Sequence, residues 1–318
     1  MKKRKIIIDC DPGHDDAIAL LVALASPQLD VKAITTVAGN SYIGSTTENA
    51  LKILELINRI DVPVAKGAST PIINKLDVGK SIHGESGMDG PYLPKPKLKP
   101  SELSAYQMMA KVLEESDEEV VIATLGPMTN LAIFVQTYPH LISKIKYVSI
   151  MGGGLYEGNW SPIGEFNLWS DPEAVKMVIN TGLDVRFYGL DVTHQAQIHP
   201  DEFHMFSNKG KVSQFVKELL DFFAISYVGD RGLPGCPMHD SCAIMGIINP
   251  EIFKYEKASI EMDLNGLITR GSLIVDRRAD ERKFGSINGR IYLHTEREKV
   301  RDLIINVCQI LDGEVVSK

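Results

Sequence analysis

The sequence predicts an α/β protein built on an open, mainly parallel sheet with helices on both faces. Over the first 200 residues, short apolar runs alternate with longer segments of helical periodicity. Several apolar runs are continuous, as expected for parallel strands that are covered on both faces. No internal repeat, low-complexity tract or evident linker interrupts this pattern. We therefore expect residues 1–318 to form a single domain with a Rossmann-like arrangement of strands and helices.

The first third of the chain contains three predicted strands and two helices. Ser45 and Glu48 form a capping box that is expected to open the second helix. Residues 69–100, rich in proline, glycine and lysine, interrupt the alternation and are expected to form a long surface loop. In order, the predictions are strand 4–9, helix 17–26, strand 31–40, helix 48–60 and strand 62–67.

The alternation then resumes and ends in a region of alternating apolar and polar residues. Ser170 and Glu173 form a second predicted capping signal, and Gly182 ends that helix. The predictions are helix 101–115, strand 120–125, helix 128–136, strand 146–153, helix 170–182, strand 184–193, an amphipathic helix over 212–223, strands 258–264, 271–276 and 289–295, and helix 295–312.

Length, charge and cysteine content exclude several classes of protein. The 318 residues can bury a large core, and the net charge of −7, with only a short basic MKKRK start, argues against a nucleic-acid partner. The apolar run after MKKRK is too short for a signal peptide, and no window approaches a membrane span. The four cysteines suggest no disulfide framework. A cytoplasmic protein that does not contact membranes is expected.

Polar side chains and glycines follow nearly every predicted strand. Ligands of open α/β sheets bind beyond the carboxyl ends of the strands, so these positions are candidate site residues. Any single polar loop needs no functional explanation, but several that meet at one sheet edge point to a site. The positions are Asp9 to Asp16, Gly39-Asn40, Leu125-Gly126-Pro127, Met151 to Gly154, and Asp191.

The first of these edges, DCDPGHDDAIAL at 9–20, contains four aspartates within eight positions. A turn at Pro12-Gly13 would bring Asp11 and Asp16 together, and the helix dipole favours acidic residues in the first turn. Capping explains one or two carboxylates, but Asp11 and Asp16 together would repel unless a cation lay between them. Clustered carboxylates select hard cations such as Ca²⁺ or Mg²⁺.

Other motif assignments fail. Counted from Asp9, the sixth and twelfth positions of an EF-hand loop hold His14 and Leu20 in place of glycine and glutamate, and neither a GxxxxGK[ST] loop nor a GxGxxG motif is present. Cys236, His239 and Cys242 have zinc-like spacing but lack a clear fourth ligand. Asp240 suits a hard cation better, and the adjacent His239 could supply a proton.

Six segments together resemble the inosine–uridine preferring nucleoside hydrolase family. They occur in the same order as in the family, from residue 9 to residue 240, and the DxDPGxDD segment is itself highly specific. The segments are DCDPGHDDAIAL at 9–20, VAGN at 37–40, LGPMTNLA at 125–132, MGGG at 151–154, EFNLWSDPEA at 165–174 and MHD at 238–240.

The resemblance implies hydrolysis of the N-glycosidic bond of ribonucleosides, in nucleoside catabolism or salvage, by a homo-oligomer such as a dimer or tetramer. It implies one Ca²⁺ held by Asp11, Asp16, Asp240 and the backbone carbonyl of Leu125. In this mechanism Asp11 takes a proton from a Ca²⁺-bound water, and His239 is the general acid for the leaving base.

The resemblance also implies the residues that contact the substrate. Asp15, Asn40 and Asn167 match positions that hold or orient the 2′ and 3′ hydroxyls, and Met151, Asn159 and Glu165 match positions that place the sugar. Phe166 would line the pocket and His83 would lie near the base. Tyr227 could stack on the base or belong to the core, and Arg231 could meet a pyrimidine carbonyl or point to solvent. Purine or pyrimidine preference stays open, and Asp9 is expected to support the site from behind.

Two other functions compete with this interpretation. A haloacid-dehalogenase-like phosphohydrolase also has a DxD after its first strand and binds Mg²⁺, but it requires neither DPGxDD nor the distal His239-Asp240 pair. A non-catalytic nucleoside- or calcium-binding protein could retain the same scaffold. The presence of both Asp11 and His239 favours an enzyme.

Overall fold

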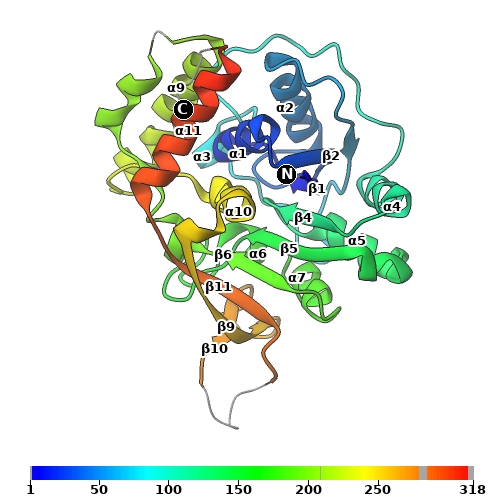
Figure 1. Cartoon of the computed structure of the whole chain (residues 1–318). Coiled ribbons are helices and arrows are strands. Elements are labelled where there is room, and N and C mark those ends of the chain that lie inside the picture. The colour runs from blue at the N-terminus through cyan, green and yellow to red at the C-terminus, as the bar shows by residue number, and fades with distance from the viewer. Residues whose placement is uncertain (1, 208, 279–284, 314–318) are drawn as a thin grey trace.

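The computed structural model describes residues 2–207, 209–278 and 285–313, and its centre is a large twisted sheet (Figure 1). Within these residues the sheet has nine strands in the order β10-β9-β11-β6-β5-β4-β1-β2-β3. The pairs from β11 through β3 are parallel, while β9 is antiparallel to both β10 and β11. The strands are β1 (Arg4–Cys10), β2 (Leu29–Thr36), β3 (Val64–Lys66), β4 (Val120–Thr124), β5 (Ile145–Met151), β6 (Val185–Tyr188), β9 (Phe253–Met262), β10 (Leu273–Asp276) and β11 (Gly289–Thr295).

Helices cover both faces of the sheet, which confirms the predicted α/β class. Successive residues of β1 point to opposite faces, so Ile6 and Ile8 enter one apolar core and Ile7 enters the other. The first core is covered by α1 (His14–Ala25), α2 (Ile43–Leu56), α9 (Lys211–Ala224), α10 (His239–Ile248) and α11 (Arg297–Leu311). The second is covered by α4 (Ala105–Glu115), α5 (Thr129–Thr137) and α7 (Pro172–Ile179).

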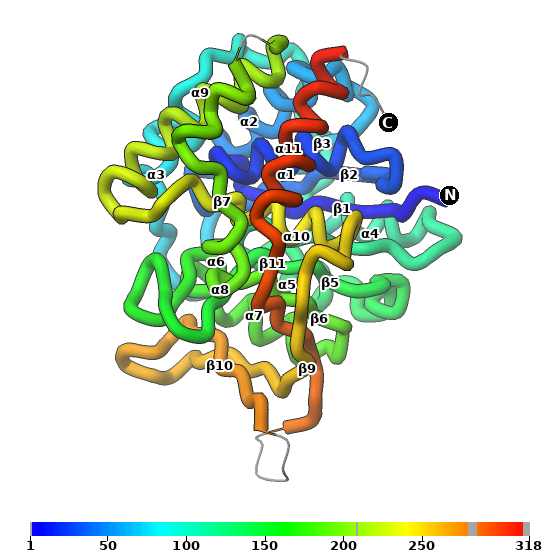
Figure 2. The backbone as a smooth tube through the Cα atoms, turned by 60° about the vertical axis from the view of Figure 1, so that its left-hand side comes forward, coloured from blue at the N-terminus to red at the C-terminus, as the bar shows by residue number. Residues whose placement is uncertain are grey.

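Shorter elements connect these layers. The antiparallel β9, β10 and β11 project from one end of the molecule, as both views show (Figures 1 and 2). None of the helices in the described ranges is long and apolar enough to cross a membrane. The short elements are α3 (Lys80–His83), α6 (Phe166–Ser170), α8 (Leu190–Thr193), the 3₁₀ turns Pro139–Lys144, Pro200–Phe206 and Pro250–Ile252, the π-helical turn Ile225–Asp230, and the small sheet of β7 (Gln197–Ile198) and β8 (Cys236–Pro237).

Both predicted capping signals are wrong in detail. Helix α2 begins at Ile43, so Ser45 lies inside its first turn, where the hydroxyl of Thr47 bonds back to the Ile43 carbonyl at 2.7 Å. Helix α7 is capped by Asp171, whose carboxylate accepts the Ala174 amide, while Ser170 ends the preceding helix. The residue directly before the helix is thus Tyr42 for α2 and Asp171 for α7, and not the predicted serine.

Two other predictions also need correction. The strand predicted over 184–193 ends at Tyr188, after which the Leu190 amide donates to the Gly153 carbonyl and α8 begins; Asp191 therefore lies in a helix. The 69–100 segment is not wholly a surface loop, because it contains α3 and buries Ile82, His83 and Met88. This segment returns to the sheet edge and helps to form the site.

Candidate active site

The turn between β1 and α1 is closed by one of its own carboxylates. Asp16 accepts the backbone amides of Asp11 at 3.2 Å and Gly13 at 3.0 Å. It also accepts the side-chain amide of Asn40 at 2.9 Å. Capping of the first helical turn therefore explains part of the role of Asp16, as expected for an acidic residue at this position.

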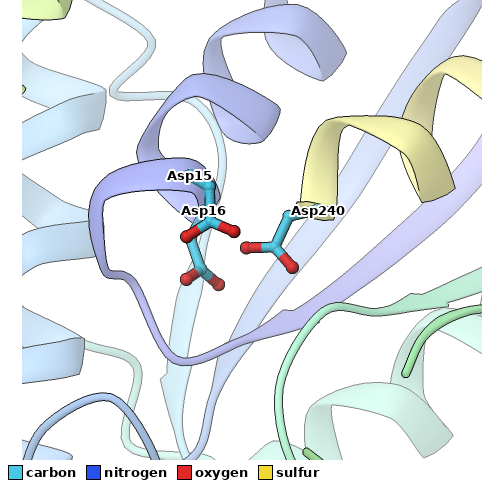
Figure 3. Close-up of side chains that lie close together, drawn as sticks. All are labelled: Asp15, Asp16 and Asp240. Atoms are coloured by element: carbon cyan, nitrogen blue, oxygen red, sulfur yellow. The ribbon is translucent and has the colours of Figure 1, made fainter. Parts of the chain in front are cut away.

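Three carboxylates meet just beyond the ends of the strands (Figure 3). Oxygens of Asp15, Asp16 and Asp240 lie within 4.8 Å of one another; the first two come from α1 and the third from the start of α10. All three are buried. Burial raises the pKa of Asp240 well above its usual range, and the charges of Asp15 and Asp16 raise it further. A cation would offset this concentration of negative charge.

Asp11 lies outside this trio, in a pocket shaped by two glycines. One of its oxygens accepts the Asn40 backbone amide at 2.7 Å, and the other, Oδ1, is buried without a hydrogen-bond partner among the described residues. A Cβ added to Gly39 or Gly126 would lie 2.1 or 2.2 Å from the Asp11 carboxylate oxygens. Burial, and then the charge of Asp16, raises the pKa of Asp11. An orphaned carboxylate oxygen fits a metal ligand.

The backbone carbonyl of Leu125 accepts the side-chain amide of Asn167 at 2.6 Å. A carbonyl oxygen has two lone pairs, so this bond leaves one for another partner. The available donors of the predicted set are all oxygens, which fits Ca²⁺ or Mg²⁺. Cys236 and Cys242 are buried thiols whose pKa values burial raises, and within the described ranges neither belongs to the carboxylate cluster. The zinc interpretation therefore has no support.

A cavity opens above these carboxylates. It brings together every residue predicted to contact substrate, together with His239, Asp240 and Leu125. Asp11 and Asp16 do not line it; they are buried behind Asn40, which hydrogen-bonds to both. Gly79, Ile82 and Trp160 also line it, although they were not predicted. The residues predicted from the sequence are Asp15, Asn40, His83, Leu125, Met151, Asn159, Glu165, Phe166, Asn167, Tyr227, His239 and Asp240.

The predicted sugar-binding wall is held rigidly by its own backbone. Glu165 caps α6 and accepts the amides of Gly153 at 3.0 Å, Asn167 at 3.0 Å and Leu168 at 3.2 Å. Burial raises its pKa to about 7, although these amides favour the charged form. Asn159 accepts the amide at the start of the same helix, that of Phe166, at 2.9 Å.

His239, which lines the same cavity, is held between two hydroxyl groups. Its Nδ1 lies 2.7 Å from the Thr193 hydroxyl, and its Nε2 lies 3.0 Å from the Tyr227 hydroxyl. Burial lowers the pKa of His239 and raises that of Tyr227, so both neutral forms are favoured. Tyr227 thus both lines the cavity and packs on Phe223, and the exposed Arg231 lies over its ring at 5.2 Å.

Behind His83 lies a second histidine that the sequence patterns did not assign. The Nδ1 atoms of His14 and His83 are 3.1 Å apart, and His14 Nε2 lies 2.7 Å from the Asp89 carbonyl. The His14 ring also stacks on Phe222 and Phe223, 5.1 and 5.2 Å between centroids. His14 therefore ties the 80–89 segment to the first turn of α1.

Asp9 lies behind the cavity and connects three elements. Its Oδ1 accepts the Thr35 hydroxyl at 2.6 Å and the Asn130 amide at 2.8 Å, which joins β1 to β2 and α5. Burial raises the pKa of Asp9 to about 7, against the effect of those two hydrogen bonds. Neither partner lines the cavity, so a supporting role of Asp9 in the site stays a prediction.

Two neighbours of the predicted site residues that sequence reasoning missed, Trp160 and Thr193, carry weak sequence signals. Trp160 follows Asn159, contacts Phe166 edge-on at 4.8 Å and donates its indole N–H to Asp77 at 3.2 Å. Only its position beside a predicted site residue could have indicated it. Thr193 lies in a segment whose apolar pattern predicts a strand, so nothing local pointed to His239.

Comparisons with known proteins agree on one family. A sequence profile described as inosine-uridine preferring nucleoside hydrolase matches residues 6–303. A pyrimidine-specific ribonucleoside hydrolase RihA of Escherichia coli O1:K1 / APEC is 47% identical over 273 residues, 85% of this chain and 88% of that protein. Among solved structures, a purine-preferring ribonucleoside hydrolase from Gardnerella vaginalis has a TM-score of 0.90 at 27% identity, covering 97% of this chain and 99% of its own. The plant nucleoside hydrolase PpNRh1 has a TM-score of 0.89 at 28% identity, with the same coverage.

Proposed function

Because the chain belongs to the inosine-uridine preferring nucleoside hydrolase family, we propose that its cavity hydrolyses the N-glycosidic bond of a ribonucleoside to give the free base and ribose. The observation that carries this proposal is that one cavity brings together two kinds of group. It is lined by Asp15 and Asp240, two of the three buried carboxylates of the cluster, and by His239 with its partner Tyr227. Family membership also argues against the phosphohydrolase alternative.

The metal proposed is Ca²⁺, held by Asp11, Asp16, Asp240 and the Leu125 carbonyl. Two observations support an oxygen-bound cation here: the unpartnered Asp11 Oδ1 and the crowding of Asp16 with Asp240. When bound, such an ion lowers the pKa of a water molecule and orients the sugar hydroxyls. Asp15, which belongs to the same trio, is available on the cavity surface to accept a hydrogen bond from a ribose hydroxyl.

We assign the two proton transfers to residues on opposite sides of the sugar. As water oxygen attacks C1′, Asp11 accepts its proton; as the C1′–N bond breaks, its electron pair moves to the base and His239 supplies a proton there. The anionic carboxylates also stabilise the positive charge that develops on the sugar. Asn40 and Asn167 keep their amides on the carboxylates and the Leu125 carbonyl, which holds this side in place.

The sugar-binding roles follow from the walls of the cavity. Met151 and Phe166 offer apolar surface, while Asn159 and Glu165 are fixed by α6 where the 5′ end of the ribose is proposed to lie. His83 faces the base side with Tyr227. A missing ribose hydroxyl would leave buried polar groups unpaired, so we expect ribosides to be preferred over deoxyribosides.

A pyrimidine ribonucleoside is the proposed preferred substrate. The support is the 47% identity to a pyrimidine-specific hydrolase, against 27% to the purine-preferring structure. The polar groups that we assign to the base end are Tyr227, His239 and His83, which line the cavity, while Arg231 lies outside the lining and over the Tyr227 ring.

The test is a kcat/KM panel over uridine, cytidine, inosine, adenosine and guanosine, with 2′-deoxyuridine and p-nitrophenyl phosphate as controls. We expect ribosides to turn over, uridine and cytidine fastest. Removal of divalent ions by a chelator should abolish this turnover, and Ca²⁺ should restore it. Release of phosphate without free base would contradict the proposal, and full activity in chelator would refute the metal assignment.

We further propose that the chain acts in the cytoplasm as a homo-oligomer, a dimer or a tetramer, with residues 1–318 as one domain. Sedimentation velocity on the full chain measures the oligomer directly. A monomer at all concentrations would contradict it.

A further inference from the structure

We propose that Thr193 is a positioning residue that holds the His239 ring with its Nε2 atom toward Tyr227 and the cavity. This inference rests on the proposed role of His239 as general acid. It concerns a residue outside the cavity lining, at the end of α8, whose single hydroxyl meets the far side of the histidine ring.

The contact is short and buried. Thr193 Oγ1 lies 2.7 Å from His239 Nδ1, and the two side chains are 0% and 4% exposed. Helix α8 follows β6 after one glycine, and its backbone amides at Leu190 and Thr193 donate to Gly153 and Gly189. The hydroxyl is therefore held at a defined point against the start of α10.

Thr193 differs in this respect from Thr47 and Thr137, two other threonines in the helices of this chain. The hydroxyls of Thr47 and Thr137 bond back to the carbonyls four residues earlier, at 2.7 and 2.8 Å, which is the usual arrangement within a helix. The hydrogen bond described for the Thr193 hydroxyl is instead the one to His239. The Thr193 hydroxyl and His239 Nδ1 are therefore hydrogen-bond partners, whichever of the two donates.

This contact sets the orientation of the ring. With Nδ1 held against the Thr193 hydroxyl, the other nitrogen, Nε2, lies 3.0 Å from the Tyr227 hydroxyl. Tyr227 and His239 both line the cavity, so Nε2 lies on the side where the base is proposed to leave. Without the Thr193 hydroxyl the ring loses this contact, and Nε2 is no longer held in one position from which to give a proton to the base.

His194, the next residue, cannot replace this hydroxyl. Its ring lies 5.5 Å from the His239 ring between centroids, and its Nδ1 pairs with Glu157 at 2.8 Å. It therefore packs beside His239 and makes its own hydrogen bond elsewhere. Of these two neighbours, only Thr193 hydrogen-bonds to Nδ1 of His239 and can orient its ring.

The experiment compares uridine with p-nitrophenyl β-D-riboside in the Ca²⁺-loaded full chain. Nitrophenolate departs without being protonated, so a residue that acts through the general acid affects uridine much more than the nitrophenyl substrate. For Thr193→Val, which keeps the shape and removes the hydroxyl, we expect kcat on uridine to fall roughly 10- to 100-fold. The loss on the nitrophenyl riboside should be at least about tenfold smaller.

Three further variants make the comparison specific. Thr193→Ser keeps the hydroxyl and should restore most of the uridine activity. Thr47→Val makes the same chemical change at another buried helical threonine, where we expect the ratio of the two substrates to be unchanged. Thr193→Ala should show the same ratio of kcat on uridine to kcat on the nitrophenyl riboside as Thr193→Val, so the proposal stays testable if the valine variant misfolds.

His239→Ala separates this inference from the proposed function. If His239→Ala lowers kcat on both substrates by the same factor, the general-acid assignment fails. If His239→Ala shows the selective loss but Thr193→Val and Thr193→Ala do not, or if Thr193→Ser behaves like Thr193→Val, the positioning role is overturned while the general acid stands.

Discussion

At the scale of single residues, the site combines buried charge with tight backbone packing. Asp11 shows both, because its carboxylate is fully buried and two glycine backbones leave no room for a side chain beside it. Charge crowded in this way is costly without a counter-ion, and such groups concentrate at functional sites. Glycine at 39 and 126 is therefore required by the carboxylate as much as by any substrate.

Asp11→Asn should separate activity from folding. The amide cannot take the proton of the attacking water, so we expect kcat on uridine to fall roughly 10²- to 10⁴-fold. Removing one of several crowded negative charges should leave the urea midpoint of the chelated protein unchanged or higher. Asp117→Asn, at an exposed acid near the amino ends of the strands, is the control. Unchanged turnover of every riboside would show that Asp11 is not the base.

Gly39→Ala should damage the site through a single methyl group. Its Cβ would lie 2.1 Å from Asp11 Oδ2, so the carboxylate must move, and we expect weaker Ca²⁺ binding and lower kcat. Gly44→Ala in the first turn of α2 is the matched control, because nothing lies within 4 Å of its added Cβ. It should stabilise the fold slightly, by about 0.5 kcal/mol. Equal Ca²⁺ affinity in the two variants, measured by calorimetry, would refute the steric argument.

At the scale of elements, helix α9 depends on the end of the last helix. Asp312, just after α11, accepts the amides of Val212 at 2.8 Å and Ser213 at 3.0 Å in the first turn of α9. The other end of α9 leads directly to Tyr227 through the π-helical turn. The end of α11 thus supports the segment that carries Tyr227.

Asp312→Ala should lower stability by removing this cap. The expected loss in the free energy of unfolding is about 0.5–2 kcal/mol, measured by urea denaturation, and Asp312→Asn should recover part of it. Asp302→Ala is the control, since its carboxylate makes an exposed pair with Arg301 worth about 0–1 kcal/mol. A loss at position 302 as large as that at 312 would contradict the capping role.

The element boundaries also show the limits of sequence patterns. Apolar runs such as that of β1 predicted strands well because burial on both faces requires them. The predicted cap of α2 lies three positions past Tyr42, where that helix is entered, and the predicted cap of α7 lies one position before Asp171. The polar residues near each helix start did not show at which of them the chain enters the helix. Helix α8 was missed because its four residues are fixed by contacts with Gly153 and not by their own periodicity.

At the scale of the whole molecule, a partly buried ion-pair cluster joins α11 to the segment before α9. Glu202 pairs with Arg297 at 2.8 Å and Arg301 at 2.6 Å. Burial alone would raise the pKa of Glu202, but hydrogen bonds from Arg297, the His199 amide and Arg301 lower it from 4.5 to about 2. The charged form is therefore favoured by folding.

This lowered pKa predicts how stability depends on pH. The ion pairs contribute fully above about pH 4.5 and are lost as the pH falls toward 2, because the unfolded chain takes up the proton first. Glu202→Gln should be destabilising at pH 7 and progressively less so between pH 4.5 and 3, by urea denaturation. Glu114→Gln, at an exposed position on α4, is the control and should show no such trend. A pH-independent difference for Glu202→Gln would contradict the ion-pair argument.

The sequence by itself determined the α/β class and the acidic strand-to-helix turn, which follow from apolar periodicity and turn chemistry. Most cavity residues were named through the resemblance to a known family. Only the tertiary structure decided that Asp240 meets Asp15 and Asp16, that Asp11 rests between Gly39 and Gly126, and that Thr193 faces His239. The physical reason is that these interactions act through space between distant segments, so no local pattern encodes their distances.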